Sequence, residues 1–241
     1  MRQPHEIRPL SFETGLQLHA DGSCLVRLGN THVICSASLE EKVPGWMKGK
    51  GQGWITAEYG MLPRATNTRT DREAAKGKQQ GRTVEIQRLI GRSLRQAVDL
   101  RLLGERQLTL DCDVLNADGG TRCAAITGAW VALAIALRKA SLEAALVRQV
   151  AAVSAGILEP AAEADWARRS GLILDLEYEE DHRAAVDTNL VAARAAKALE
   201  IVEFQSTGEG RSFTRAEAVA LVDLGLQGCE ILMAAQLEAL A

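Results

Sequence analysis

The feature that constrains this fold most is a sharp turn between a strand-like run and a strongly apolar helix. Apolar and polar residues alternate from Arg106 to Leu115, which predicts a strand with one apolar face. From Cys123 to Leu137 the sequence is apolar around most of a helical circumference, which implies a central, buried helix. The turn between them, residues 118–122, contains two adjacent glycines that allow a sharp reversal. We therefore expect an α/β fold organised around this unit.

The turn Asp118-Gly119-Gly120-Thr121-Arg122 also has the chemistry of an anion site. Its glycines leave the backbone open to close approach, and the first N–H groups of the following helix have no partner within that helix. The guanidinium of Arg122 adds a positive charge. These features favour phosphate. The turn alone leaves a second interpretation open, which is a glycine turn with a solvent-exposed arginine.

Three further elements of the first half are predicted by local patterns. The segment Gly22 to Glu40 alternates as two strands around Gly29-Asn30, a pair that tolerates positive φ and indicates a hairpin. Trp54 to Tyr59 is strand-like. Apolar residues at helical spacing from Val84 to Val98 predict an amphipathic helix. Arg82 precedes the first turn of that helix, where it could also face an anion.

The second half repeats the order of strands followed by a helix. Strand-like runs cover Gln149–Leu158, Gly171–Glu177 and Glu200–Gln205. Thr214–Leu240 predicts a C-terminal helix, or a pair of helices divided by glycines. With 241 residues, the chain is long enough for one large domain. We expect a single domain over residues 1–241 with two similar halves.

The basic residues are concentrated in one segment. Between Lys42 and Arg106 there are 14 Lys and Arg residues against 6 Asp and Glu, although the whole chain has a net charge of −3. Within this segment, residues 62–78 have almost no large apolar side chain and cannot be buried. Loops of this length without regular structure are usually functional or disordered. We interpret it as an arginine-bearing arm that could lie along a phosphate backbone, with a mobile loop of incidental charge as the alternative.

A group of carboxylates in the second half suggests a metal site. Asp175, Glu177 and Glu179 are expected to project from one face of a continuing strand, with Asp181 next to them. So many carboxylates are costly together unless a cation shares the space, and oxygen-rich clusters suit Mg²⁺ or Mn²⁺. Asp187 could join them after a turn. An acidic strand end exposed to water is the alternative.

Several other classes of protein are disfavoured by the sequence. Five cysteines without C-x-x-C spacing and four scattered histidines argue against disulfides and structural zinc. No run approaches the roughly 18 apolar residues of a membrane span, and the N-terminus lacks the features of a signal peptide. We expect a cytoplasmic protein. A phosphate site, an acidic cluster and a basic arm are most simply combined in a phosphoryl-transfer enzyme that acts on a nucleic acid.

Long motifs over nearly the whole chain resemble the ribonuclease PH family of bacteria. The motifs that carry this resemblance are Gly53–Arg64, Arg72–Lys78, Gly81–Thr83, Glu85–Arg92, Leu110–Leu115, Ala117–Arg122, parts of Asp175–Asp181, and Glu203–Gln205. The resemblance implies a phosphate-dependent 3′→5′ exoribonuclease, a tRNA nucleotidyltransferase that trims tRNA precursors and releases nucleoside diphosphates. It also implies the α/β fold of that family, which is like ribosomal protein S5 domain 2, and a hexameric ring built as a trimer of dimers.

The resemblance also assigns roles to individual residues. It implies an inorganic phosphate site, metal-binding carboxylates for Mg²⁺ or Mn²⁺, and a basic arm that binds tRNA. Arg82, Gly120, Thr121 and Arg122 match the phosphate site, Asp175 and Asp181 the metal site, and Arg64, Arg69 and Arg72 the arm. Among these, Arg82, Arg122, Asp175 and Asp181 are expected to be catalytic. Phosphate held by the first group would attack the last phosphodiester, and Asp181 would help to protonate the leaving 3′-oxygen.

Two other functions remain open at this point. The first is a non-catalytic, RNA-binding ring subunit of an exosome-like assembly, and the second is a hydrolytic nuclease that uses the same acidic cluster. A scaffold needs no phosphate site beside a metal site, so the presence of both argues against the first. The dependence of product formation on phosphate would separate the phosphorolytic enzyme from the nuclease.

Overall fold

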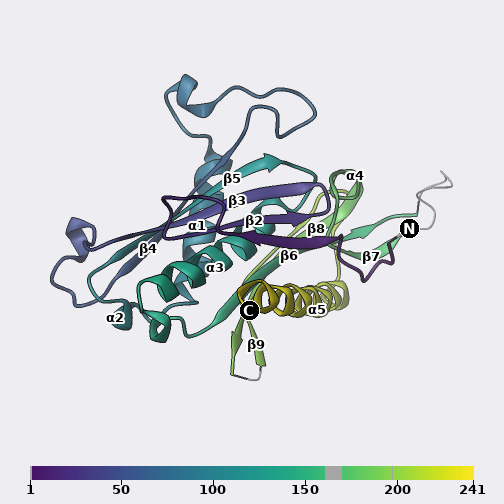
Figure 1. Ribbon diagram of the computed structural model, residues 1–241. Coiled ribbons are helices and arrows are strands. Elements are labelled where there is room, and N and C mark those ends of the chain that lie inside the picture. The colour runs from purple at the N-terminus through teal and green to yellow at the C-terminus, as the bar shows by residue number, and fades with distance from the viewer. Residues whose placement is uncertain (1, 161–169, 197) are drawn as a thin grey trace.

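The computed structural model describes residues 2–160, 170–196 and 198–241, which form two β-sheets around a central helix (Figure 1). The first sheet has the strand order β1-β2-β3-β5-β4, and the second has the order β7-β6-β8-β9. The strands are β1 (Leu10–Thr14), β2 (Gly22–Leu28), β3 (Thr31–Glu40), β4 (Trp54–Met61), β5 (Gln107–Asn116), β6 (Gln149–Leu158), β7 (Gly171–Leu174), β8 (Ala184–Ala195) and β9 (Ala198–Gly208). The α-helices are α1 (Gly81–Arg95), α2 (Leu100–Leu103), α3 (Thr121–Lys139), α4 (Tyr178–Arg183) and α5 (Arg215–Leu240).

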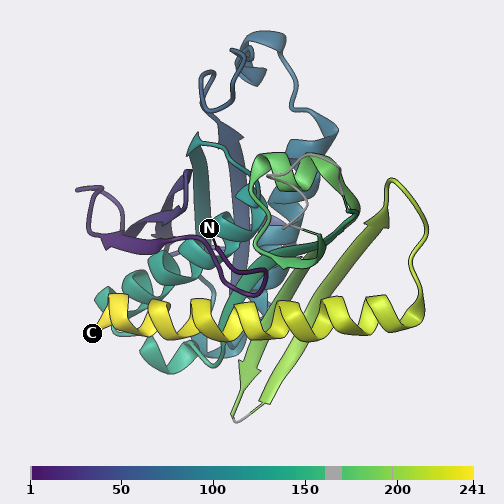
Figure 2. The same cartoon turned by 90° about the vertical axis from the view of Figure 1, so that its right-hand side faces the viewer.

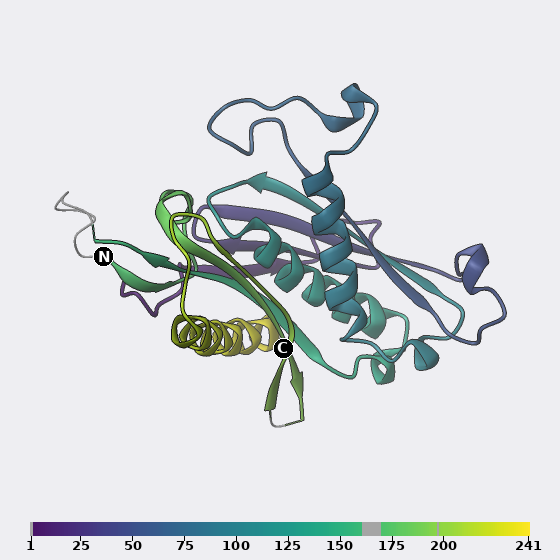
Figure 3. The same ribbon diagram turned by 180° about the vertical axis from the view of Figure 1, so that it is seen from behind.

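The first sheet follows the alternation in its sequence. The predicted hairpin is confirmed, because β2 and β3 pair in antiparallel register from Leu28 and Thr31 at the turn, and Gly29 has a positive φ of 56°. Strand β5 then pairs with β3 on one side and runs parallel to β4 on the other. The apolar residues of these strands form one buried face, which α1 and α3 cover together. Figure 3 shows α1 crossing that face.

Helix α3 is the central element of the fold, as the sequence predicted. Most of its residues are buried, because it packs against β2 and β3 of the first sheet and against β6 of the second. Gly128 lies on the face of the helix that packs against β2 and β3. A Cβ at this position would stand 2.7 Å from Val26 Cγ1 and 3.1 Å from Cys35 Sγ. The glycine therefore sets the distance between helix and sheet.

Substitution Gly128→Ala is expected to destabilise the protein. Alanine favours helix over glycine by about 1 kcal/mol, whereas overpacking a core costs about 1–3 kcal/mol. The contact distance makes overpacking the larger effect, so we expect the free energy of unfolding to fall by about 1–2 kcal/mol in denaturant titration. Gly81→Ala is the matched control, since nothing lies within 4 Å of a Cβ at the first residue of α1. Equal stability of the two variants would contradict this account.

The second sheet packs between α3 and α5. Strand β6 is buried along its whole length, with α3 on one face and α5 on the other. Figure 2 shows α5 crossing the second sheet as one continuous helix. The side chain of Gln236 joins the two helices across the edge of β6, because its Nε2 donates to the backbone oxygens of Thr127 and Val150. The alternative of two C-terminal helices is thus wrong, and Gly225 and Gly228 pack against β-sheet side chains within one helix.

Two parts of the second half differ from the sequence prediction. The strand expected over Gly171–Glu177 ends at Leu174, and Asp175 has a positive φ of 56°. A short helix, α4, begins at Tyr178 behind a capping box between Glu177 and Glu180. Acidic side chains stabilise a helix N-terminus, so the carboxylate-rich sequence favours a helix start over a strand. Strand β8 was not predicted, although it lies between β6 and β9.

Helices α3 and α5 are both long and apolar enough to cross a membrane by length and composition alone. The sequence prediction looked for unbroken apolar runs and found none of sufficient length. The mean hydropathy of 18 consecutive residues is a different criterion, because it tolerates scattered polar residues. In α3, 78% of the window is buried within the protein, which explains its apolar composition. In α5 the buried share is 33%, since the helix packs on the sheet with one face.

Candidate active site

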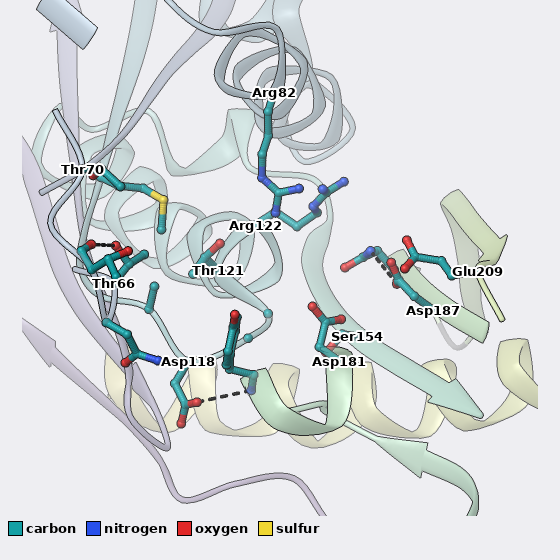
Figure 4. A pocket seen from close by; sticks show the side chains of 18 residues that line it. Thr66, Thr70, Arg82, Asp118, Thr121, Arg122, Ser154, Asp181, Asp187 and Glu209 are labelled. Atoms are coloured by element: carbon teal, nitrogen blue, oxygen red, sulfur yellow. Dashed lines mark hydrogen bonds between the residues drawn. The ribbon is translucent and has the colours of Figure 1, made fainter. Parts of the chain in front are cut away.

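A cavity of about 530 Å³ lies where the ends of several elements from both sheets meet. Its wall includes the turn before α3, the first turn of α1, helix α4, strand β8 and the base of the arm. Figure 4 shows Arg82 and Arg122 on one side of this cavity and Asp181 and Asp187 on the other. Among the residues that line it are Asp118, Gly119, Gly120, Thr121, Arg122, Arg82, Asp181 and Asp187.

The glycine turn before α3 has the backbone geometry of an anion cradle. Gly119 and Gly120 both have positive φ, at 76° and 64°, a region that glycine occupies without steric cost. Gly120 occupies the N-cap of α3 and has no side chain to cap the helix. The first N–H groups of α3 are therefore open to a bound anion. Thr121 is fixed in place, because the hydroxyl of Tyr59 donates to its Oγ1 at 2.9 Å.

The structure brings Arg82 and Arg122 to the same cavity from two different helices (Figure 4). Arg82 lies in the first turn of α1 and Arg122 in the first turn of α3. The Arg122 guanidinium is oriented by two neighbours, as Nη1 donates to Gln205 Oε1 at 2.9 Å and lies 3.3 Å from Glu85 Oε1. The Arg122 side chain is 12% exposed and lines the cavity, where it can meet a ligand. The predicted phosphate site consisted of Arg82, Gly120, Thr121 and Arg122. All four residues line this cavity.

Two aspartates form the acidic side of the cavity. Burial raises the pKa of Asp181, and the positive charges of Arg82 and Arg122 work in the opposite direction. Burial, and after it the charge of Asp181, raise the pKa of Asp187 to about 6, although the charge of Arg122 works in the opposite direction. The two carboxylates therefore interact with each other and with the arginines. Two oxygen ligands of this kind could hold one divalent cation together with substrate oxygens.

Asp175 does not lie on this cavity, in contrast to its predicted role as a metal ligand. It is fully buried, and its two carboxylate oxygens accept hydrogen bonds from the backbone N–H, Nε and Nη2 of Arg8. Across the part of the chain that the structure describes, no group of three or more His, Cys, Asp or Glu side chains gathers as a metal site. The donor set that fits a cation is therefore Asp181 with Asp187. The prediction failed at Asp175 because it assumed a strand that ends one residue earlier.

Asp118 connects the glycine turn to α4. Its Oδ1 accepts the N–H of Tyr178 at 3.2 Å, and its Oδ2 accepts the side-chain amide of Asn30 at 3.1 Å. Its own N–H donates to the hydroxyl of Thr31. These bonds hold the turn against α4 and the β2–β3 hairpin. Sequence reasoning left Asp118 without a role, because none of its partners is near it in the chain.

The basic arm rises from the end of β4 and returns to α1 (Figure 1). Arg64, Arg69 and Arg72 are all exposed, and Arg69 pairs with Asp71 at 3.1 Å. They do not line the 530 Å³ cavity, although Thr66 and Thr70 of the same arm do. Arg72 lines a second cavity of about 660 Å³, which shares Arg82 with the first. The arm thus leads from an exposed basic surface to the site.

Comparisons with known proteins agree with this geometry. Residues 6–139 match the 3′ exoribonuclease family, domain 1. Ribonuclease PH of Caulobacter vibrioides is 54% identical over 98% of this chain and 95% of its own length, and that of Roseobacter denitrificans is 51% identical over 100% and 98%.

Solved structures show the same fold at lower identity. Rice Rrp46 has a TM-score of 0.77 and 17% identity, with coverage of 100% of this chain and 98% of its own. The Archaeoglobus fulgidus exosome with RNA bound to the active site gives a TM-score of 0.76 and 20% identity over 96% of this chain and 89% of that one. The predicted fold class is confirmed. The chain therefore belongs to the 3′ exoribonuclease family of ribonuclease PH.

Proposed function

We propose that this protein is a phosphate-dependent 3′→5′ exoribonuclease that releases nucleoside diphosphates from RNA. The observation that carries the proposal is one cavity with an anion cradle on one side and an interacting carboxylate pair on the other. The cradle suits inorganic phosphate as a co-substrate, and the carboxylates suit proton transfer and charge balance at a phosphodiester. The full-length similarity to proteins named Ribonuclease PH supports the same reaction.

The roles of the residues follow from where charge changes in this reaction. Arg82, Thr121, Arg122 and the open N–H groups of α3 hold phosphate with an oxygen directed at the last phosphodiester. When a phosphate oxygen attacks the phosphorus of this phosphodiester, the bond from phosphorus to the 3′-oxygen of the preceding nucleotide breaks. The departing 3′-oxygen then needs a proton. Burial raises the pKa of both Asp181 and Asp187, that of Asp187 to about 6, so this carboxylate pair is the candidate source of that proton. A divalent cation such as Mg²⁺, held by Asp181 and Asp187, would offset negative charge on the phosphoryl oxygens.

We propose tRNA precursors as the substrate class, with Arg64, Arg69 and Arg72 on the RNA backbone. The arm is exposed, basic and continuous with the cavity, which suits a double-stranded stem next to a 3′ end. A sequence-independent contact of this kind predicts binding that weakens with added salt.

The cytoplasmic location and the single domain over residues 1–241 stay predictions.

We propose that the protein forms a hexameric ring. The resemblance to the ribonuclease PH family implies this ring, and exosome structures are among the structural neighbours. Three arginines of α1, Arg88, Arg92 and Arg95, have a spacing that would suit subunit contacts. Two of them are engaged within the chain, since Arg92 pairs with Glu203 and Arg95 lies over the ring of Trp54. The mass of the wild-type protein in solution decides the oligomeric state.

Product analysis in the presence and absence of phosphate is the experiment that tests the reaction. The protein is incubated with a 3′-extended RNA and Mg²⁺, with and without inorganic phosphate. Nucleoside diphosphates that appear only with phosphate are expected. Monophosphates formed regardless of phosphate would indicate a hydrolytic nuclease, and no product in either case would favour a non-catalytic ring subunit. The presence of both the cradle and the carboxylate pair argues against that subunit.

A further inference from the structure

Behind the phosphate cradle lies a buried ion pair that the reaction itself does not use. Arg8 is 5% exposed and Asp175 is fully buried. Arg8 Nη2 donates to Asp175 Oδ1 at 2.7 Å, and Arg8 Nε and the backbone N–H donate to Oδ2 at 2.9 and 2.8 Å. The two residues are far apart in sequence and form a two-pronged contact in space. Such a fork fixes the plane of the guanidinium as well as its position.

The other side of the same guanidinium holds the glycine turn. Arg8 Nη1 donates to the backbone oxygen of Asp118, and Nη2 donates to that of Gly119 at 3.4 Å. The hydroxyl of Thr31 donates to the oxygen of Gly119 as well, at 2.6 Å. A Cβ on Gly120 would lie 3.3 Å from Arg8 Nη2, so the ion pair lies directly against the N-cap of α3.

These contacts determine which way the amides of the turn point. In a trans peptide the C=O and the following N–H point in opposite directions. With the oxygens of Asp118 and Gly119 held by Arg8, the N–H groups of Gly119 and Gly120 point away from it. The carbonyl oxygens, which would repel an anion, are thereby kept on the side of the ion pair. We propose that Arg8 and Asp175 are positioning residues that orient the phosphate cradle.

The backbone around Asp175 supports a positioning role. Asp175 has a φ of 56°, a region that costs energy for residues other than glycine and persists where the surroundings fix it. Its N–H donates to the oxygen of Ser154 at 2.7 Å, and the next N–H, of Leu176, donates to Ser154 Oγ at 3.1 Å. A Cβ on Gly119 would stand 2.4 Å from the oxygen of Leu176. The glycine turn and the segment around Asp175 are therefore closely packed, with no room for a side chain at Gly119.

A stabilising role alone does not explain the pair. A buried ion pair is often no more stabilising than apolar side chains of similar volume, because removing both charges from water is costly. Among the residues that the structure describes, the remaining donors of Arg8 go to the oxygens of Asp118 and Gly119 in the cradle. This inference rests on the proposed function, since it assigns the pair to the phosphate site of that reaction.

The test is phosphate affinity in a double variant, Arg8→Met with Asp175→Asn. Removing both charges leaves neither residue with an unpaired charge, and Arg2, which lies 3.6 Å from Asp175 Oδ2, keeps its ion pair with Glu180. Asparagine tolerates the positive φ at position 175. Inorganic phosphate is titrated into the metal-free protein by calorimetry, and the KM for phosphate and for RNA is measured in the full reaction. We expect phosphate affinity to fall at least tenfold with a matching rise in its KM, while the KM for RNA and the melting temperature stay close to wild type. Arg8→Lys, which keeps the charge and loses the fork, should give an intermediate phosphate affinity.

The control and the contrary outcomes are distinct. Arg27→Met removes another ion pair of the N-terminal region, with Glu13, and should leave phosphate binding unchanged. Wild-type phosphate affinity in a folded double variant would overturn the positioning role. A second outcome would also overturn it: Asp175→Asn binds phosphate like wild type, but its activity depends differently on the Mg²⁺ concentration. That result would make Asp175 a metal ligand. Failure of the wild-type protein itself to bind phosphate would instead overturn the proposed function.

Discussion

Substitution Arg122→Ala is expected to lower kcat/KM for phosphate by about 10²–10³-fold, the range for loss of one charged donor at a reacting phosphate or oxyanion. Arg122 lies in the first turn of α3 beside the open N–H groups and faces the cavity with Arg82. Its loss removes both a positive charge and a two-pronged donor from the attacking phosphate. The protein should stay folded, because its contacts with Glu85 and Gln205 lie near the surface.

Steady-state kinetics with phosphate varied at saturating RNA measures this effect. Arg101→Ala is the matched control, since Arg101 is an exposed arginine on α2 that does not line the cavity. The KM for RNA should change little in either variant. An Arg122→Ala enzyme with the wild-type KM for phosphate and the wild-type rate at saturating phosphate would show that the cradle has been assigned to the wrong residues.

Substitution Asp187→Asn is expected to abolish most of the activity and to stabilise the metal-free protein at neutral pH. The side chain of Asp187 lies on the cavity with Asp181, and its loss removes a proton donor and a metal oxygen, so the rate should fall by about 10²–10⁴-fold. Stability changes in the opposite sense because the folded state raises the pKa of Asp187 from 3.8 to about 6. Asparagine occupies the same space without an ionised form.

The sign of the pH dependence follows from proton binding. The folded protein holds a proton on Asp187 more tightly than the unfolded chain does, so the stabilisation is fully present below the unfolded pKa and is lost as pH rises through about 6. Above that pH the ionised group destabilises the fold. We expect Asp187→Asn to recover about 1–2 kcal/mol at pH 8, a value reduced for the partial exposure of the group.

Denaturant unfolding at pH 4.5 and pH 8 in the presence of a chelator checks this prediction. The difference in stability between wild type and Asp187→Asn should be small at the lower pH and larger at the higher one. Asp223→Asn on α5 is the control, because Asp223 is exposed and away from the cavity. A variant that is less stable than wild type at pH 8 would mean that Asp187 is stabilised as an anion.

The sequence predicted the parts of the site that are close together in the chain. Gly120, Thr121 and Arg122 are adjacent, and the change from alternation to an apolar helix marks where they lie. The hairpin at Gly29 and the start of α5 behind Thr214 were predicted for the same reason, since turn residues and caps act on their immediate neighbours. Local chemistry is enough to define such elements.

The choice between Asp175 and Asp187 could not be made in this way. Both are aspartates near strand ends, and Asp175 was favoured because it fell in the predicted acidic strand and matched the family motif. In the structure, Asp175 turns inward to Arg8, and Asp187 reaches the cavity from a strand that was not predicted. Which carboxylate faces substrate depends on pairing between strands that are distant in the chain.

The sequence by itself thus predicted the family, the central strand–turn–helix unit and the residues that we propose for the phosphate cradle. The tertiary structure decided that the Arg8–Asp175 ion pair lies behind that cradle and that Asp181 and Asp187 lie opposite it. Arg8, Asp118 and Asp187 act through partners on other elements, so their roles appear only when the two sheets pack around α3. The physical reason is that a buried ion pair or a shared cavity is defined by distance in space, whereas sequence patterns report on neighbours along the chain.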